Sequence, residues 1–218
     1  MGPRVASAAA KSGEGEARNA SAHSDVMIDA LWLATLQTLC GRAAHEVRGS
    51  LNAVAINLEV ARSRSERPEA PASAVAPYTS VAASQLEDVI AMTEAMMGLV
   101  RQGRGPIDLA TEVSRAVTLL APAARAAGRT IELDRDLGGL GTTSAGSSSV
   151  RLAIGHCLLA VTDASPRVRT ARGAQGCQMR FEHDGGTVAL DSAVIEVLAV
   201  AGIEVQSQPS TVAITFPQ

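Results

Sequence analysis

The sequence predicts an α+β protein, a long antiparallel helical hairpin followed by an α/β sandwich. In the first half of the chain, apolar residues recur every three or four positions over two long segments, which is the period of an α-helix. From about residue 107 onward, shorter helical and strand-like segments alternate. That order is typical of a sheet with helices packed on one face.

The first half is predicted to hold a tail and two helices. Residues 1–24 are rich in Ala, Gly, Ser and Glu and lack periodicity, so we expect a disordered tail. A long helix should follow over about 25–63. Prolines and small residues over 65–77 favour a loop. A second helix is expected over about 79–102, ended by two glycines and a proline.

Both helices are amphipathic, and together they should form one domain over 25–104. Such a hairpin buries only part of its apolar surface alone. Pairing two hairpins about a twofold axis would give a four-helix bundle, so we expect a homodimer. The alternative is that the hairpin packs on the C-terminal domain of its own chain. The predicted apolar stripes are Leu36, Leu39, Ala43, Val47, Leu51, Val54, Leu58 and Ala61 in the first helix, and Leu86, Val89, Ile90, Thr93, Met96, Met97 and Val100 in the second.

The second half, 105–218, is predicted to form the α/β domain. Pro122 should kink or shorten its first helix. A Gly/Ser/Thr-rich loop is expected over 137–148. The predicted helices are 108–127, 149–164 and 189–202, and the predicted strands are 130–134, 167–171, 177–183, 203–205 and 211–216, the last two as a hairpin.

Composition limits the classes of function. Of the 218 residues 46% are hydrophobic but only 2% aromatic, so the core must be built from Ala, Leu, Val and Ile. A net charge of −3 without a basic cluster gives no reason to expect nucleic-acid binding. Cys40, Cys157 and Cys177 lack metal-binding spacing and are interpreted as buried residues of a reducing compartment. No apolar run spans a bilayer and no secretory signal is evident, so we expect a soluble, cytoplasmic protein.

His45 stands out among the four histidines. At about 100° per residue, it lies roughly 180° from the centre of the apolar stripe of its helix. Two apolar residues, Ile56 and Val60, follow within a few turns and are also off that stripe. The geometry alone fits a solvated surface histidine, which is also how we interpret His23 and His183.

The residues after this histidine carry a more specific signal. Residues 45–53 read His-Glu-Val-Arg-Gly-Ser-Leu-Asn-Ala. This string resembles the H-box of sensor histidine kinases, which typically reads His-Glu-(apolar)-(Arg/Lys)-(Thr/Asn)-Pro-Leu-Asn-Ala. Gly49 replaces the Thr or Asn that the family uses in phosphatase activity, and Ser50 replaces the Pro that bends the family's helix.

The order of elements after the hairpin resembles the ATP-binding domain of the same kinases, but its nucleotide-binding residues are missing. The family holds Mg²⁺ with Asn residues in Asn-Leu-x-x-Asn-Ala, where this chain has His156 and Ala160. The family's adenine-binding Asp lies in Asp-x-Gly-x-Gly before a long lid. Here residues 184–186 read Asp-Gly-Gly and a helix is expected almost at once, which leaves no room for a lid. We therefore expect no cofactor and no metal in this chain.

An H-box hairpin with a degenerate ATPase-like domain resembles the dimeric histidine phosphotransferases. That resemblance implies phosphoryl relay between the receiver domain of a hybrid histidine kinase and a response regulator, with Mg²⁺ brought by the receiver. His45 would be the nucleophile, Glu46 would hold or accept a proton of its ring, and Arg48 would help neutralise the phosphoryl oxygens. The residues expected to dock the receiver are Asn52, Ile56 and Val60.

Two other functions stay open on the sequence. A divergent sensor histidine kinase would still bind ATP and phosphorylate His45 itself. A non-catalytic dimeric scaffold would bind a response regulator without transferring a phosphoryl group.

Overall fold

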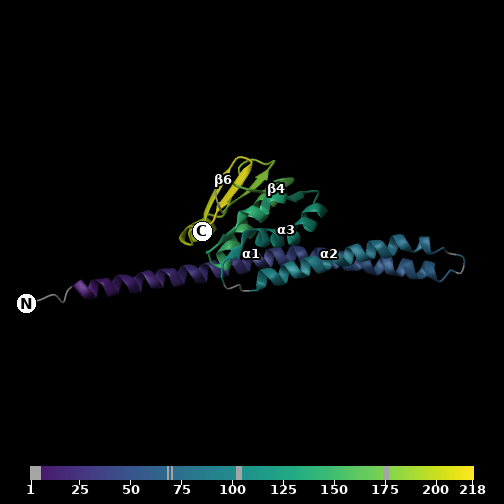
Figure 1. Cartoon of the computed structure of the whole chain (residues 1–218), viewed down its shortest axis with the longest axis horizontal. Helices are drawn as coiled ribbons and strands as arrows, with labels where there is room; N and C mark the ends of the chain where they lie inside the picture. The colour runs from purple at the N-terminus through teal and green to yellow at the C-terminus, as the bar shows by residue number, and fades with distance from the viewer. Residues whose placement is uncertain (1–5, 68, 70, 102–104, 174–176) are drawn as a thin grey trace, which may run out of the picture.

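The protein is arranged in three layers: a sheet, a middle layer of helices, and the helical hairpin (Figure 1). The computed structural model describes residues 6–67, 69, 71–101, 105–173 and 177–218, with side chains from residue 22 onward. The helices are α1 (Ala6–Ser65), α2 (Ala76–Val100), α3 (Leu109–Ala126), α4 (Ser147–Ala164) and α5 (Ser192–Val200). The strands are β1 (Ile107–Asp108), β2 (Thr130–Leu133), β3 (Thr142–Thr143), β4 (Arg167–Arg172), β5 (Gln178–His183), β6 (Glu204–Gln208) and β7 (Thr211–Thr215).

The hairpin of α1 and α2 has the predicted order but a longer first helix. α1 begins at Ala6, so residues 6–24, expected as a disordered tail, are helical, and residues 1–5 lie outside the described residues. This segment is rich in alanine, the best helix former, and it extends a helix that is already nucleated. α2 begins at Ala76, before the expected residue 79, because Pro77 is tolerated in the first turn. The expected end at residue 102 lies outside the described residues.

The sheet of five strands has the order β2-β4-β5-β7-β6. β2 pairs with β4 in parallel, and the other neighbours are antiparallel, including the predicted β6–β7 hairpin. The short antiparallel pair β1–β3 was not predicted. α3 continues through Pro122 to Ala126, so the proline does not shorten it. Gly202, with φ of 73°, follows the end of α5 as expected of a helix-stopping glycine.

The helices cover one face of the sheet, as the sequence predicts. Alternate residues of β5 are buried, and α4, which is buried on nearly every side, packs on β4, β5 and β7. The interpretation of His183 as a surface residue is wrong, because its side chain is among these core-facing residues and only 5% exposed. Burial removes water from the ring and lowers the pKa of His183 below its ordinary value.

The hairpin packs on the α/β part of its own chain, which was the alternative to the pairing of two hairpins in a dimer. α1 contacts α3, α4 and α5, and α2 contacts α3. At the centre of this junction α4 has Gly155, where a Cβ would lie 3.0 Å from Cγ2 of Thr35 and 3.3 Å from Cδ1 of Leu39. Trp32 and Met92 belong to the same buried cluster as the core of the α/β part. The far half of the hairpin projects beyond this junction (Figure 1).

Two further expectations concern cysteines and membranes. Cys157 and Cys177 are buried, Cys40 is half-buried, and all three thiols are free. Burial raises the pKa of the Cys157 thiol to about 12, so this thiol is protonated at neutral pH. Within the described residues, every helix is too short or too polar to span a bilayer.

Candidate functional site

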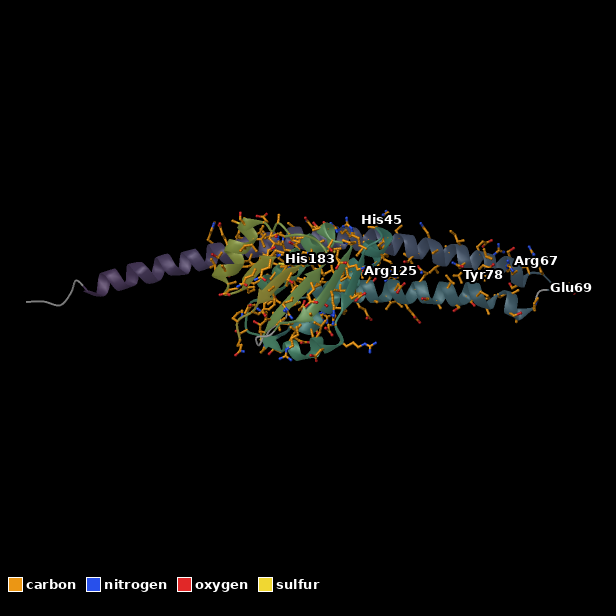
Figure 2. The ribbon with its side chains drawn as sticks, turned by 90° about the horizontal axis from the view of Figure 1, so that it is seen from above. His45, Arg67, Glu69, Tyr78, Arg125 and His183 are labelled. Atoms are coloured by element: carbon orange, nitrogen blue, oxygen red, sulfur yellow. The ribbon has the colours of Figure 1, made fainter. Side chains whose placement is uncertain are left out.

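His45 lies on the exposed surface of α1, at the edge of the junction between the hairpin and the α/β part. Figure 2 places it on the outer side of the helix, near the point where the middle layer ends and the bare hairpin begins. Its side chain is exposed, whereas Leu39 and Ala43, six and two residues earlier, are fully buried. The prediction that this imidazole faces away from the core is therefore confirmed.

The apolar residues of α1 form two stripes where the sequence suggested one. Leu39, Ala43 and Ala61 are buried, but Leu51 and Leu58 are 46% and 50% exposed. At about 100° per residue, the two exposed leucines lie roughly 120–140° from His45, between its face and the buried face. The imidazole is thus separate from both apolar stripes.

The expected site residues fall on different parts of the helix surface. Asn52 and Ile56, seven and eleven residues after His45, share its face and are exposed, Ile56 to 64%. Val60 is half-buried and lies on the margin of that face. Of the expected docking residues, Asn52 and Ile56 are therefore brought together with His45, and Val60 only in part.

The expected helpers are near His45 in sequence but do not bond to it. Glu46 is half-buried and points about 100° away from His45, while Arg48 is exposed about 60° away. Within the part of the chain that the structure describes, His45, Glu46 and Arg48 have no hydrogen-bond or ion-pair partner. The catalytic roles assigned to Glu46 and Arg48 stay predictions.

An ion pair beside the site was missed by sequence reasoning. Arg42, three residues before His45, donates two hydrogen bonds to Asp163 at the end of α4, at 2.8 and 2.7 Å. Arg129 donates to the Thr162 carbonyl at 2.8 Å and lies 3.4 Å from the same carboxylate. The hydrogen bonds from Arg42 hold the pKa of Asp163 below its ordinary value. A separation of 121 residues between the two partners leaves no local signal.

His156, one of the two α4 residues at positions where the resemblance implies Mg²⁺-binding asparagines, makes a contact within the chain. Nε2 of His156 accepts a hydrogen bond from the backbone N–H of Asp191 at 3.4 Å. Burial lowers the pKa of His156, which favours the neutral ring that such an acceptor requires. Asp191 in turn caps α5 by accepting from the N–H of Ala193. His156 thus has a structural contact, which joins α4 to the residue before α5.

The other nucleotide-related candidate, residues 184–186, is a bend after β5. Asp184 is exposed after β5, and its backbone N–H donates to Oγ of Ser165 at 3.1 Å. Across the described ranges, no group of three or more His, Cys, Asp or Glu side chains is placed to hold a metal ion.

Comparisons with known proteins give matches in structure alone. No family model matches the chain, and no curated protein matches its sequence. The chain is similar to the cytoplasmic segment of histidine kinase QseC, with a TM-score of 0.43 and 12% identity over 62% of this chain and 94% of that one. It is similar to the Acinetobacter baumannii histidine kinase AdeS (TM-score 0.37, 13% identity, 78% and 94%). It is also similar to full-length ShkA in complex with AMPPNP (TM-score 0.40, 17% identity, 83% and 45%).

Proposed function

We propose that the chain is a histidine phosphotransferase that passes a phosphoryl group between receiver-domain aspartates through His45 without using ATP. The observation that carries the proposal is an exposed imidazole, away from every apolar stripe of α1, within a string that resembles the H-box. The proposed partners are response regulator receiver domains and a hybrid histidine kinase.

The transfer requires from this chain mainly an accessible ring nitrogen of His45. The unprotonated ring nitrogen of His45 attacks the phosphorus of an aspartyl phosphate, an N–P bond forms, and the P–O bond to the aspartate breaks. The aspartate leaves as a carboxylate with the bonding electron pair, and the proton on the other ring nitrogen passes to water or to Glu46. The receiver supplies its own Mg²⁺, which neutralises charge on the phosphoryl oxygens. Positioning is therefore the main contribution of α1.

The contacts of α4 support a relay that does not use ATP. Ala160 has no side-chain ligand atom, and His156 is engaged by the backbone of Asp191. Asp191 is also the residue that caps the start of α5, so His156 takes part in a contact within the chain. A kinase would need these two α4 positions to hold the metal ion of its nucleotide.

Homodimerisation is supported by a second apolar face on the hairpin. On α2 this face repeats at intervals of three and four residues with Thr93 at its centre, which is the spacing of a helix–helix seam. Exposed apolar residues in such a row mark an interaction surface, and a twofold pairing would cover both hairpins at once. On α1 the face lies about 120–140° from His45, so dimerisation would leave the imidazole accessible. Its exposed apolar residues are Leu51 and Leu58 on α1 and Leu86, Ile90, Met97 and Val100 on α2.

The decisive experiment uses receiver domains of the source genome, labelled with radioactive acetyl phosphate. The wild-type chain should take up acid-labile label, and His45→Ala should not. His23→Ala is the matched control, since His23 is also an exposed histidine of α1. Equal labelling of wild type and His45→Ala would refute the proposal.

Two further arms separate the other functions. Label on His45 from Mg²⁺-ATP alone, or micromolar binding of ATP by calorimetry, would show a kinase. Receiver binding that persists in His45→Ala, with no label in the wild type, would show a scaffold. For the dimer, Ile90→Lys should halve the mass measured by light scattering, and an unchanged mass would contradict the proposed interface.

A further inference from the structure

Two glycines flank His45 along the helix axis. Gly41 lies four residues before it and Gly49 four residues after it. Residues four apart in a helix are neighbours on one face, so these are the positions whose side chains would stand beside the imidazole. Both glycines are exposed, and a Cβ built on either would meet no atom within 4 Å.

Packing within the chain does not explain these two glycines. Each costs the helix about 0.8–1 kcal/mol relative to alanine. The two glycines at other helix contacts have clear reasons: a Cβ at Gly155 would press on α1, and one at Gly98 would collide with the side chain of Arg115. Gly41 and Gly49 have open space on their side, so alanine at either position would fit and stabilise the fold. The reason for glycine at these two positions is therefore expected to be a contact with another molecule.

We infer that Gly41 and Gly49 keep the helix surface bare on both sides of His45 so that a receiver domain can close around the imidazole. This inference rests on the proposed phosphotransfer function. A receiver is a doubly wound α/β domain whose reactive site lies in the crevice at the carboxyl ends of its strands. An imidazole can enter a recessed site only if the loops around that site pass on either side of the ring. The two glycines lie about 6 Å along the axis on each side, where those loops would meet α1.

The flanks of His45 favour an approach along the helix. Arg42 and Arg48 lie about 60° to either side of the imidazole, and Arg42 is held there by Asp163. The strip of α1 that lacks large side chains next to His45 therefore runs along the helix axis, from Gly41 past His45 toward the exposed Asn52 and Ile56.

Substitutions of graded size test this inference. Gly41→Leu and Gly49→Leu add bulk beside His45, while Gly41→Ala and Gly49→Ala add one methyl group. Ser63→Leu is the matched control, because Ser63 is exposed on the same face of α1, 18 residues or about 27 Å away. Each variant is labelled by two donors: a receiver phosphorylated with radioactive acetyl phosphate, and phosphoramidate, a small donor that needs no docking. Thermal unfolding is followed in parallel.

The leucine variants should lose about a hundredfold in transfer rate from the receiver, because a displacement of about 1 Å at the reacting atoms costs that much. Their labelling by phosphoramidate should stay within about twofold of wild type, and the alanine variants should unfold at higher temperature. Ser63→Leu should match wild type with both donors.

Two outcomes would overturn the inference. The first is a leucine variant that accepts label from the receiver as fast as wild type. The second is an equal loss with both donors, which would mean that the substitution harms His45 itself and not the docking. A wild-type chain that phosphoramidate labels but that no receiver labels would instead refute the proposed function, and the inference with it.

Discussion

Replacement of Arg151 by methionine should destabilise the protein by about 3 kcal/mol, because it removes a charged partner of the buried Glu112 carboxylate. The side chains of Arg151 and Glu112 are each only 6% exposed. Nε and Nη2 of the arginine donate to the two carboxylate oxygens at 3.0 and 3.2 Å. The remaining bonds go to the carbonyls of Arg101 at 2.9 Å and Gly98 at 3.3 Å, so α4 caps the end of α2.

The magnitude follows from what the substitution leaves behind. Removal of one partner of a buried ion pair costs about 3–5 kcal/mol. Arg115 still donates to Oε1 of Glu112 at 2.7 Å, which places the loss at the lower end of that range. A variant that also carries Glu112→Leu has no stranded charge, so its total loss should be below about 2 kcal/mol, smaller than that of Arg151→Met alone.

The assay is urea unfolding followed by circular dichroism at one fixed protein concentration, because the proposed self-association would make the measured stability depend on concentration. Two results would refute the reasoning. One is a loss of less than about 1 kcal/mol for Arg151→Met, and the other is a double variant less stable than the single one. Either would mean that the ion pair does not hold the end of α2 against α3 and α4.

Three further predictions concern the core and the junction. As pH falls below about 6.5 toward 5.5, the free energy of unfolding should decrease, because burial lowers the pKa of His183 and His156 and the unfolded chain then binds protons that the folded chain does not. The variant His183→Asn should lose less stability over this interval. A variant with the same pH dependence as wild type would contradict the lowered pKa of His183. Gly155→Val should lower stability by about 1–3 kcal/mol in thermal unfolding, since a Cβ there already lies 3.0 Å from a carbon of α1. The side chains of Arg42 and Asp163 are 33% and 50% exposed, so a double-mutant cycle on this pair should give a coupling free energy below about 1 kcal/mol that decreases in high salt. A larger coupling free energy that does not depend on salt would contradict this degree of exposure.

The sequence alone determined the parts of this protein that depend on local periodicity. Intervals of three and four residues predicted α1 and α2, and alternation predicted β5 and the β6–β7 hairpin. The outward direction of His45 also followed from its place on the helix, and the string over 45–53 is the basis for the role proposed for it. These features are readable because each residue's environment is set by neighbours within one or two turns.

Only the tertiary structure decided which element covers each apolar face. The stripe of α1 looks continuous in sequence, yet Ala43 is buried under the chain's own α/β part while Leu51 is left exposed. The Arg42–Asp163 pair joins positions 121 residues apart, and His183 becomes a core residue because α4 covers its side of the sheet. A periodic pattern records that a face is apolar but not what packs on it, since that depends on contacts between segments distant in sequence.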